Sequence, residues 1–172
     1  MNRTIKLLTI GLSLSLSAVA GARDVDHKWC PPETPVPPAP VAQTERVNLS
    51  ADALFRFDKA ASTDLLPAGK TTLDNLGNAL RTEYAVIDGI SLIGHTDRLG
   101  NDKYNFNLGL QRAKTVKSYL QNLGVTAPIS VASAGETQPT TNCPGTKATA
   151  ELKACLQPDR RVSVDITGTR KK

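Results

Sequence analysis

Proline concentrates in one short stretch of this 172-residue chain and limits where a folded domain can lie. Six of the eleven prolines fall within residues 30–41, namely Pro31, Pro32, Pro35, Pro37, Pro38 and Pro40. Because proline fixes φ and lacks the backbone N–H that a sheet requires, such a run favours extended polyproline II. We therefore predict a stiff spacer, with a short head and linker over residues 23–44 and one folded domain over residues 45–172.

The first 22 residues have the order of a secretory signal peptide. Two positive charges, Arg3 and Lys6, precede an apolar run over residues 7–16, and small residues follow up to Ala22. This run is shorter than the ~20 residues that a membrane-spanning helix needs. We expect export, with cleavage after either Ala20 or Ala22.

The formal net charge of +5 is not distributed as in a nucleic-acid-binding protein. Two basic residues lie in the signal peptide and three in the C-terminal tail, and the remaining basic and acidic residues balance at 16 each. Nucleic-acid binding requires a concentrated basic face and aromatic rings for stacking, and aromatic residues make up only 4% of the chain. We expect no nucleic-acid partner.

The spacing of apolar residues within the domain alternates between that of strands and that of helices. Strands are predicted over residues 47–55, 87–95, 129–134 and 162–166. Helices are predicted after Pro67, between about Leu108 and Gly124 with Asn101 or Asp102 as its cap, and over the short stretch 147–153. This order indicates an α+β or α/β sandwich with helices over a small sheet.

Three cysteines occur, at positions 30, 143 and 155. In an oxidising compartment Cys143 and Cys155 are expected to form a disulfide, which stabilises the fold by about 3 kcal/mol for a loop of this size. A metal site is the alternative, but the chain has no C-x-x-C and its two histidines lie far away in sequence. Cys30 is then a free thiol or an intermolecular link. We expect no metal and no cofactor.

The residues with the clearest chemistry follow the second predicted strand. Asp97 lies on the loop that leaves this strand, and Gly100 lets the chain turn back. Asn105, Gly109 and Arg112 then share one stripe of the following helix. A carboxylate and a guanidinium held side by side suit a zwitterion such as an amino-acid head group. The alternative is an ordinary Asp97–Arg112 salt bridge, which the spacing alone favours.

Several motifs in the same order resemble the OmpA-like peptidoglycan-binding domain family. They are GHTDxxG over residues 94–100, NxxLxxxRAxxVxxxL over 105–120, LFxFDK over 54–59 and PDRRVxV over 158–164. The resemblance covers roughly residues 45–168 and implies an α+β fold, β-α-β-α-β-(α)-β, with a small mixed sheet. The cysteine pair before PDRR resembles the branch that includes RmpM, and we expect a chain of that type, with no membrane barrel before the linker.

The resemblance implies binding of the peptidoglycan stem peptide through its diaminopimelate residue. Asp97 would bind the free ammonium and Arg112 the carboxylate. Asn105 would add hydrogen bonds, and Thr96 and Leu99 would line the same loop. The Arg160-Arg161 pair is expected to be structural or to line the rim. Gly109 stands where the family usually has Ser, which would remove one polar contact.

The residue inventory argues against catalysis. His95 is the only histidine inside the domain and is expected to be a packed residue at a strand end, and no hydrolase or nucleotide-binding motif occurs. The resemblance implies a tether between the outer membrane and the cell wall, in the periplasm of a Gram-negative bacterium. The alternative is an interaction protein whose head docks on outer-membrane porins or pairs with a second copy through Cys30.

Overall fold

Four strands form one mixed sheet in the computed structural model, which describes residues 42–171. The strands are β1 (Gln43–Ser50), β2 (Tyr84–His95), β3 (Ile129–Gly135) and β4 (Arg161–Arg170). Their order is β1-β4-β2-β3, with β4 antiparallel to both of its neighbours and β3 parallel to β2. The predicted α+β class and mixed sheet are confirmed.

The predicted signal peptide, head and proline spacer lie almost entirely outside the described residues, as does Cys30. Their assignments therefore stay predictions. Strand β1 begins at Gln43, two residues before the predicted start of the domain.

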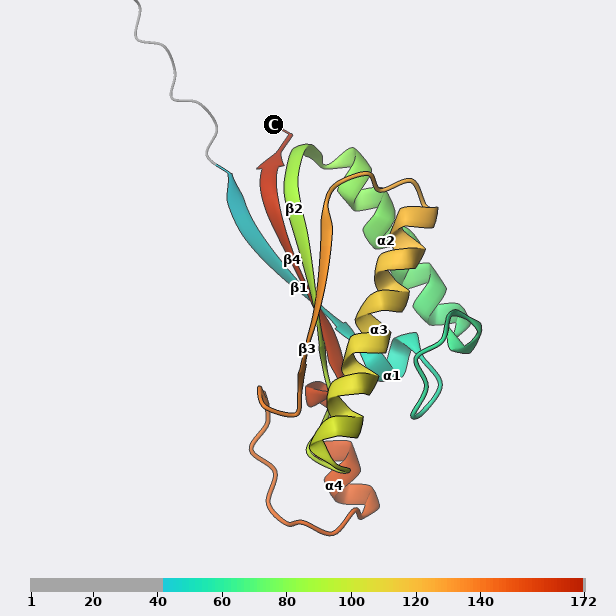
Figure 1. Cartoon of the computed structure of the whole chain (residues 1–172), viewed down its shortest axis with the longest axis vertical. Coiled ribbons are helices and arrows are strands. Elements are labelled where there is room, and N and C mark those ends of the chain that lie inside the picture. Colours follow the sequence, from blue (N-terminus) through green and yellow to red (C-terminus); the bar gives the residue numbers. More distant parts are fainter. Residues whose placement is uncertain (1–41, 172) are drawn as a thin grey trace, which may run out of the picture. The chain divides into compact units, whose positions relative to one another are not determined.

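Two long helices lie against one face of the sheet (Figure 1). These are α2 (Pro67–Thr82), with Pro67 at its first position, and α3 (Asp102–Asn122). Asn101 caps α3, since its side chain accepts a hydrogen bond from the Tyr104 amide at 2.9 Å. Shorter helical segments are α1 (Ala51–Leu54), α4 (Ala150–Cys155), η1 (Ser62–Asp64) and η2 (Gln157–Asp159).

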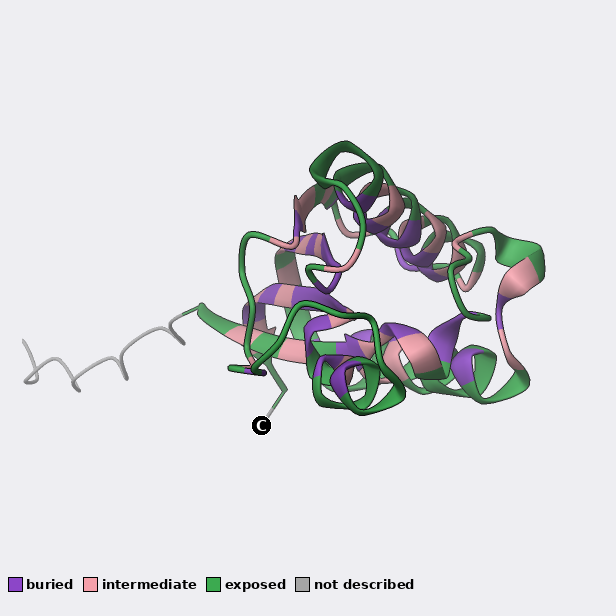
Figure 2. Ribbon diagram, turned by 90° about the horizontal axis from the view of Figure 1, so that it is seen from below, coloured by how far each residue is buried: buried purple, intermediate pink, exposed green. Residues whose placement is uncertain are grey.

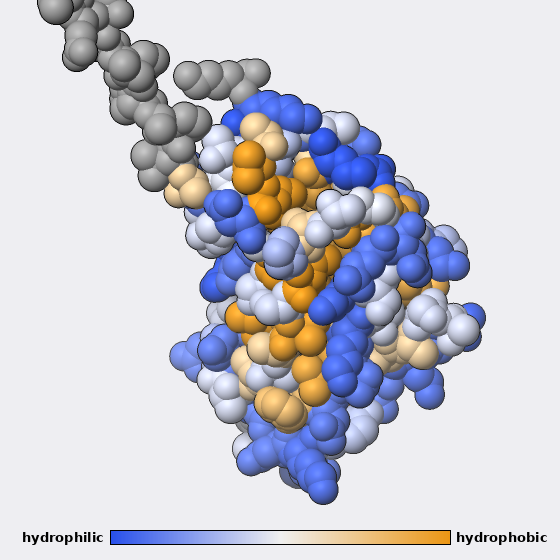
Figure 3. All heavy atoms as spheres, turned by 45° about the horizontal axis from the view of Figure 1, so that its top comes forward, coloured by the Kyte–Doolittle hydropathy of each residue, from blue (hydrophilic) through white to orange (hydrophobic). Residues whose placement is uncertain are grey.

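The core lies between the two long helices and the sheet, where buried residues of both layers face each other (Figure 2). Each buried Leu, Ile or Val side chain contributes roughly 1.5–3 kcal/mol. The main contributors are Leu73 and Leu80 of α2, Ala113, Val116 and Leu120 of α3, Ile90 and Leu92 of β2, and Val162, Val164 and Ile166 of β4. On the face drawn in Figure 3, hydrophobic residues gather in one stripe with hydrophilic residues on both sides.

Strand β1 is shorter than its alternating pattern predicts. The pattern extends to Phe55, but the strand ends at Ser50 and the next four residues form α1. The Ala51 amide donates to the Arg160 carbonyl at 2.9 Å, just before the chain enters β4. Ala51 and Leu54, three positions apart, are both fully buried, which a helical turn allows and a strand would not. The prediction of a strand over residues 51–55 was therefore wrong.

Two glycines allow α3 to approach β2 very closely. A Cβ at Gly94 would lie within van der Waals overlap of the Gly109 carbonyl, and a Cβ at Gly109 would lie 2.5 Å from the Ser133 hydroxyl. Neither position can hold a side chain without a shift of the backbone. This contact fixes the start of α3 beside the loop that leaves β2.

The predicted disulfide is present between Cys143 and Cys155, with their Cα atoms 6.0 Å apart. It closes the segment that leads into α4, whose N-cap is Thr149. The Thr149 hydroxyl accepts a hydrogen bond from the Leu152 amide at 3.2 Å. This cap explains why the helix begins three residues later than the predicted stretch 147–153.

The sheet register places the two ends of β1 at opposite ends of the sheet. Gln43 lies opposite Gly168, near the end of β4, whereas Ser50 and His95 both lie opposite Arg161, where β4 begins. At the Gln43 end, Arg170 forms ion pairs with Glu45 at 2.7 Å and with Glu83 at 2.8 Å. At the opposite end, the register brings together three segments: the one after β1, the one after β2 and the one before β4.

Candidate functional site

A small cavity of about 110 Å³ lies at the end of the sheet where β1 and β2 finish and β4 begins. Its lining includes all five residues predicted to bind a ligand, and those are Thr96, Asp97, Leu99, Asn105 and Arg112. Pockets for drug-sized ligands measure roughly 300–1,000 Å³. A cavity of this size suits the end of one side chain rather than a whole small molecule.

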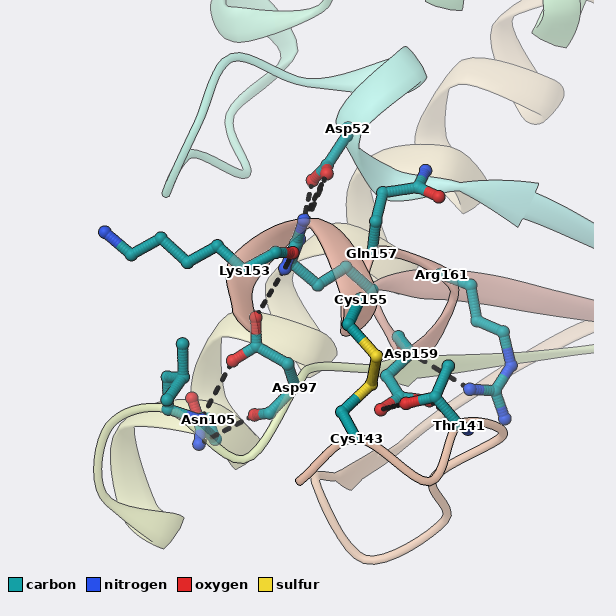
Figure 4. A network of polar contacts seen from close by, with 12 residues as sticks. Asp52, Asp97, Asn105, Thr141, Cys143, Lys153, Cys155, Gln157, Asp159 and Arg161 are labelled. Carbon is teal, nitrogen blue, oxygen red and sulfur yellow. Dashed lines mark hydrogen bonds and ion pairs between the residues drawn. A yellow bond between two sulfur atoms is a disulfide. The ribbon is translucent and has the colours of Figure 1, made fainter. Parts of the chain in front are cut away.

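The loop after β2 holds Asp97 in a fixed orientation. One carboxylate oxygen, Oδ1, accepts a hydrogen bond from the Leu99 amide at 2.9 Å. The Asn105 amide group donates to the Asp97 carbonyl at 3.2 Å, and Figure 4 shows the two side chains adjacent. Gly100 adopts φ +117°, a conformation that favours glycine and turns the chain into α3. The loop and helix therefore bring Asp97 and Asn105 together as the sequence predicted.

Arg112 is buried beneath the cavity, with only 2% of its surface exposed. Its Nε donates to the Lys59 carbonyl at 3.0 Å, and the guanidinium lies 5.8 Å from the centre of the Phe55 ring. Burial lowers the pKa of the Arg112 guanidinium from its ordinary value. Within residues 42–171, no carboxylate forms an ion pair with it, and its Nη1 has no hydrogen-bond partner. An unpartnered buried donor of this kind costs folding free energy of about 1–3 kcal/mol or more.

The Asp97–Arg112 salt bridge, the alternative that the spacing favoured, does not form. The Oδ2 atom of Asp97 instead pairs with Nη1 of Arg160 at 2.7 Å. Arg160 comes from the segment just before β4, which the sheet register carries to this end of the molecule. Arg160 was expected to be structural or to line the rim, and in the structure it lines the cavity and pairs with Asp97, a contact that the sequence analysis did not predict.

Arg160 also binds Asp52, from α1. Its Nη2 lies 2.7 Å from Oδ2 of Asp52, and its Nε lies 3.0 Å from both carboxylate oxygens of that residue. Figure 4 shows Asp52 and Asp97 directed toward this shared guanidinium from opposite sides. Hydrogen bonds to Asp52, the larger cause, and to Asp97 raise the pKa of Arg160, so the guanidinium stays charged. No sequence pattern indicated Asp52, because only the fold brings α1 to this loop.

Aromatic and charged side chains surround the mouth of the cavity. Phe57 is 73% exposed, and the ammonium of Lys153 lies 6.0 Å from the centre of its ring. The Tyr104 hydroxyl donates to Asp58 at 2.6 Å. Asp58 adopts φ +61°, a left-handed conformation uncommon for residues other than glycine. Phe57 and Asp58 belong to the LFxFDK motif. This motif was noted only as part of the family resemblance, and no role at the site was predicted for either residue.

Gly109 does not face the cavity, although it shares the helical stripe of Asn105 and Arg112. It lies against Gly94 and Ser133 and is absent from the cavity lining. The prediction that glycine here removes a polar contact to the ligand does not follow, because a side chain at this position would meet the sheet.

His95 is buried at the end of β2, as expected of a packed residue. Its Nε2 lies 3.2 Å from the Ser163 hydroxyl, which also lies 2.8 Å from Oδ1 of Asn48. Burial, followed by the charges of Arg161 and Arg46, lowers the pKa of His95 to about 4. The ring is therefore neutral at physiological pH.

The sequence of this α+β domain matches a known family. The sequence model of the OmpA family matches residues 54–153, and the chain belongs to that family. Within residues 42–171, no helix combines the length and apolar character that crossing a membrane requires.

Two relatives are named outer membrane protein A. That of Shigella flexneri is 40% identical over 134 residues, which cover 76% of this chain and 38% of the relative. That of Citrobacter freundii is 39% identical over 134 residues, which cover 76% of this chain and 55% of the relative. The chain therefore spans between about a third and about half of the length of these relatives.

Solved structures share the fold at low sequence identity. The periplasmic domain of Helicobacter pylori MotB superimposes with a TM-score of 0.57 at 19% identity, covering 74% of this chain and 75% of that one. The cell wall anchor of the type VI secretion system of Pseudomonas aeruginosa gives 0.56 at 22% identity, covering 75% and 87%. These likenesses establish the fold, whereas the function has to be argued from the site.

Proposed function

We propose that this domain binds peptidoglycan without cleaving it, by holding the zwitterionic end of diaminopimelate in the stem peptide. The observation that carries the proposal is Arg112, a buried guanidinium whose Nη1 has no partner within the described part of the chain. Keeping a buried cation only partly satisfied is costly for the fold, and a ligand carboxylate would remove that cost.

Thr96 adds a second unsatisfied group to the same cavity. Its hydroxyl is buried and has no hydrogen-bond partner among residues 42–171. A hydroxyl can donate to a carboxylate oxygen, so Thr96 and Arg112 together supply donors for one anionic group. The carboxylate of diaminopimelate would take this position.

Asp97 supplies the negative charge of the site, which would bind the ammonium group of the ligand. Its carboxylate accepts one hydrogen bond from the Leu99 amide and one from Arg160, whereas a carboxylate can accept about four. Sites therefore remain for a ligand ammonium. Asp97 and Arg112 are held apart by their own separate contacts, which keeps the two poles from neutralising each other.

The family relationship supports a place in the cell envelope. The two relatives named above are outer membrane proteins, and one protein with this fold is a cell wall anchor. Together with the predicted signal peptide, these findings favour the periplasm, with the domain on the cell wall. Docking on a porin or pairing through Cys30 would belong to the head, outside the described residues.

A pull-down with isolated sacculi tests the proposal. Wild type should sediment with the sacculi, and Asp97→Ala and Arg112→Ala should each reduce binding roughly thirty-fold or more, the effect of unpairing a charge in a partly desolvated site. Asp165→Ala is a matched control, because it removes a carboxylate that pairs with Arg46 at 2.6 Å on the sheet, outside the cavity lining. Undiminished binding by both site variants would refute the clamp, and release of soluble muropeptides by wild type would refute the absence of catalysis.

A further inference from the structure

Two carboxylates share one guanidinium beside the cavity, which leaves the group with a net charge of −1. Asp52 and Asp97 both pair with Arg160, at 2.7 Å each. Without Asp52, the Asp97–Arg160 pair would be neutral, and its attraction for a cation would be that of a dipole rather than of a charge.

Asp52 also decides which part of Arg160 reaches Asp97. It occupies the Nε and Nη2 edge of the guanidinium, the edge that binds a carboxylate most strongly through two parallel hydrogen bonds. Asp97 accepts only one hydrogen bond from this guanidinium, from Nη1, and that Nη1 also donates to the Lys153 carbonyl at 3.1 Å. Arg160 therefore makes no two-point contact with Asp97, which lines the cavity.

The burial of the three groups makes this arrangement effective. The Arg160 and Asp97 side chains are only 12% and 11% exposed, and that of Asp52 is 31% exposed. Charges in such partly desolvated positions are weakly screened and act across a site more strongly than surface charges do.

From these contacts we propose that Asp52 determines the selectivity of the cavity for a ligand that carries an ammonium group. Asp52 lines the cavity, but its carboxylate is held by the Nε and Nη2 atoms of Arg160, so it acts through that guanidinium as a positioning residue. The inference deepens the proposed function, because it explains how Asp97 can bind a cation while already paired with an arginine.

The test compares two soluble tetrapeptide stem peptides by calorimetry, one with the free diaminopimelate ammonium and one with this amine acetylated. Wild type should prefer the free amine. Asp52→Asn should lose about ten-fold or more in affinity for the free-amine peptide, and much less for the acetylated one. Asp52→Ser serves as a second neutral variant, and far-UV circular dichroism reports whether each is folded. Asp52→Glu, which keeps the charge, should keep the preference.

The outcomes separate this inference from the proposed function. Failure of wild type to bind the free-amine peptide would refute the proposed function itself. Wild-type binding with unchanged selectivity in the two neutral variants would overturn only the role of Asp52. Equal losses for both peptides would also overturn it, because they would indicate a merely structural role. Asp165→Asn, which removes a carboxylate elsewhere on the sheet, should change neither affinity.

Discussion

The carboxylate of Asp97 pairs with Arg160, 63 residues further along the chain, and not with Arg112, which lines the same cavity. Asp97 is therefore anchored by the segment before β4, whereas Arg112 is anchored by a hydrogen bond from its Nε to the Lys59 carbonyl and by its contact with the Phe55 ring. The positive and the negative pole of the cavity are supported independently. Their separate effects on stability and binding can accordingly be measured.

Arg112→Met should abolish binding without destabilising the fold. Methionine fills a similar volume and removes a buried cation that has no carboxylate partner within residues 42–171. We expect the free energy of unfolding, measured by urea denaturation, to stay within about 1 kcal/mol of wild type or to rise, while sacculus binding is lost. A clear loss of stability together with retained binding would show that Arg112 is only a structural residue.

Gly109→Ser should destabilise this chain, although the family resemblance associates serine with this position. The new Cβ would lie 2.5 Å from the Ser133 hydroxyl and 2.9 Å from the Gly94 carbonyl. Overpacking of this kind costs about 1–3 kcal/mol. Adding Ser133→Ala should recover part of the loss, and thermal denaturation of the single and double variants checks both expectations. A Gly109→Ser variant as stable as wild type would contradict the close approach of α3 to β2.

Removal of the disulfide should lower stability by about 3 kcal/mol, because the bridge constrains a loop of 12 residues in the unfolded chain. The double variant Cys143→Ala/Cys155→Ala, compared with wild type in urea without reductant, measures the effect. In the presence of reductant, wild type should fall toward the double variant. A reductant-insensitive midpoint would contradict a stabilising bridge in the purified protein.

As the pH falls, protonation of His95 should destabilise the domain at a higher pH than protonation of the domain's carboxylates does. Burial lowers the pKa of His95 from 6.5 to about 4, so the unfolded chain takes up a proton at a higher pH than the folded chain. The stabilisation is complete above about pH 6.5 and is lost as the pH falls toward 4, by up to about 3 kcal/mol. The residues that act electrostatically on the ring are Arg161, Arg46, Asp159 and Asp165.

His95→Gln should remove this part of the pH dependence. Hydrogen bonds from Arg46 lower the pKa of Asp165, and hydrogen bonds from Thr140 and Thr141 lower that of Asp159 despite its burial. Their stabilisation is present above the unfolded value of about 4 and is lost only below it, so the two ranges are separate. Urea denaturation at pH 7, 5.5 and 4.5 should show the decline in wild type and a flatter profile in the variant. Equal slopes would refute the role of His95.

The cavity residues on the β2–α3 segment could be predicted because a short loop and one helix bring them together. Thr96, Asp97 and Leu99 precede the helix that carries Asn105 and Arg112, and helical periodicity places the last two on one face. The structure brings all of them to one cavity. Local geometry placed Asp97, Asn105 and Arg112 together, whereas their role as ligand-binding residues and the inclusion of Thr96 and Leu99 came from the family resemblance.

The partner of Asp97 could not be predicted in this way. Arg160 reaches the cavity only because β4 pairs with both β1 and β2, and strand register depends on contacts that are distant in sequence. Asp52 was hidden for a related reason, since alternation over residues 47–55 predicted a strand where burial of Ala51 and Leu54 produces a helical turn. Spacing therefore identified Asp97 and Arg112 but favoured a salt bridge between them, whereas Asp97 pairs with Arg160.

The placement of β1 has a mechanical consequence. The predicted spacer precedes Gln43, at one end of the strand, and the proposed wall-binding cavity lies beyond Ser50, at the other. Tension between a membrane attachment and the cell wall would therefore run along the strand axis. Under such shear, the hydrogen bonds that join β1 to β4 share the load, whereas a pull across the strand would open them one after another. This geometry is suited to a tether that must hold while the envelope is stretched.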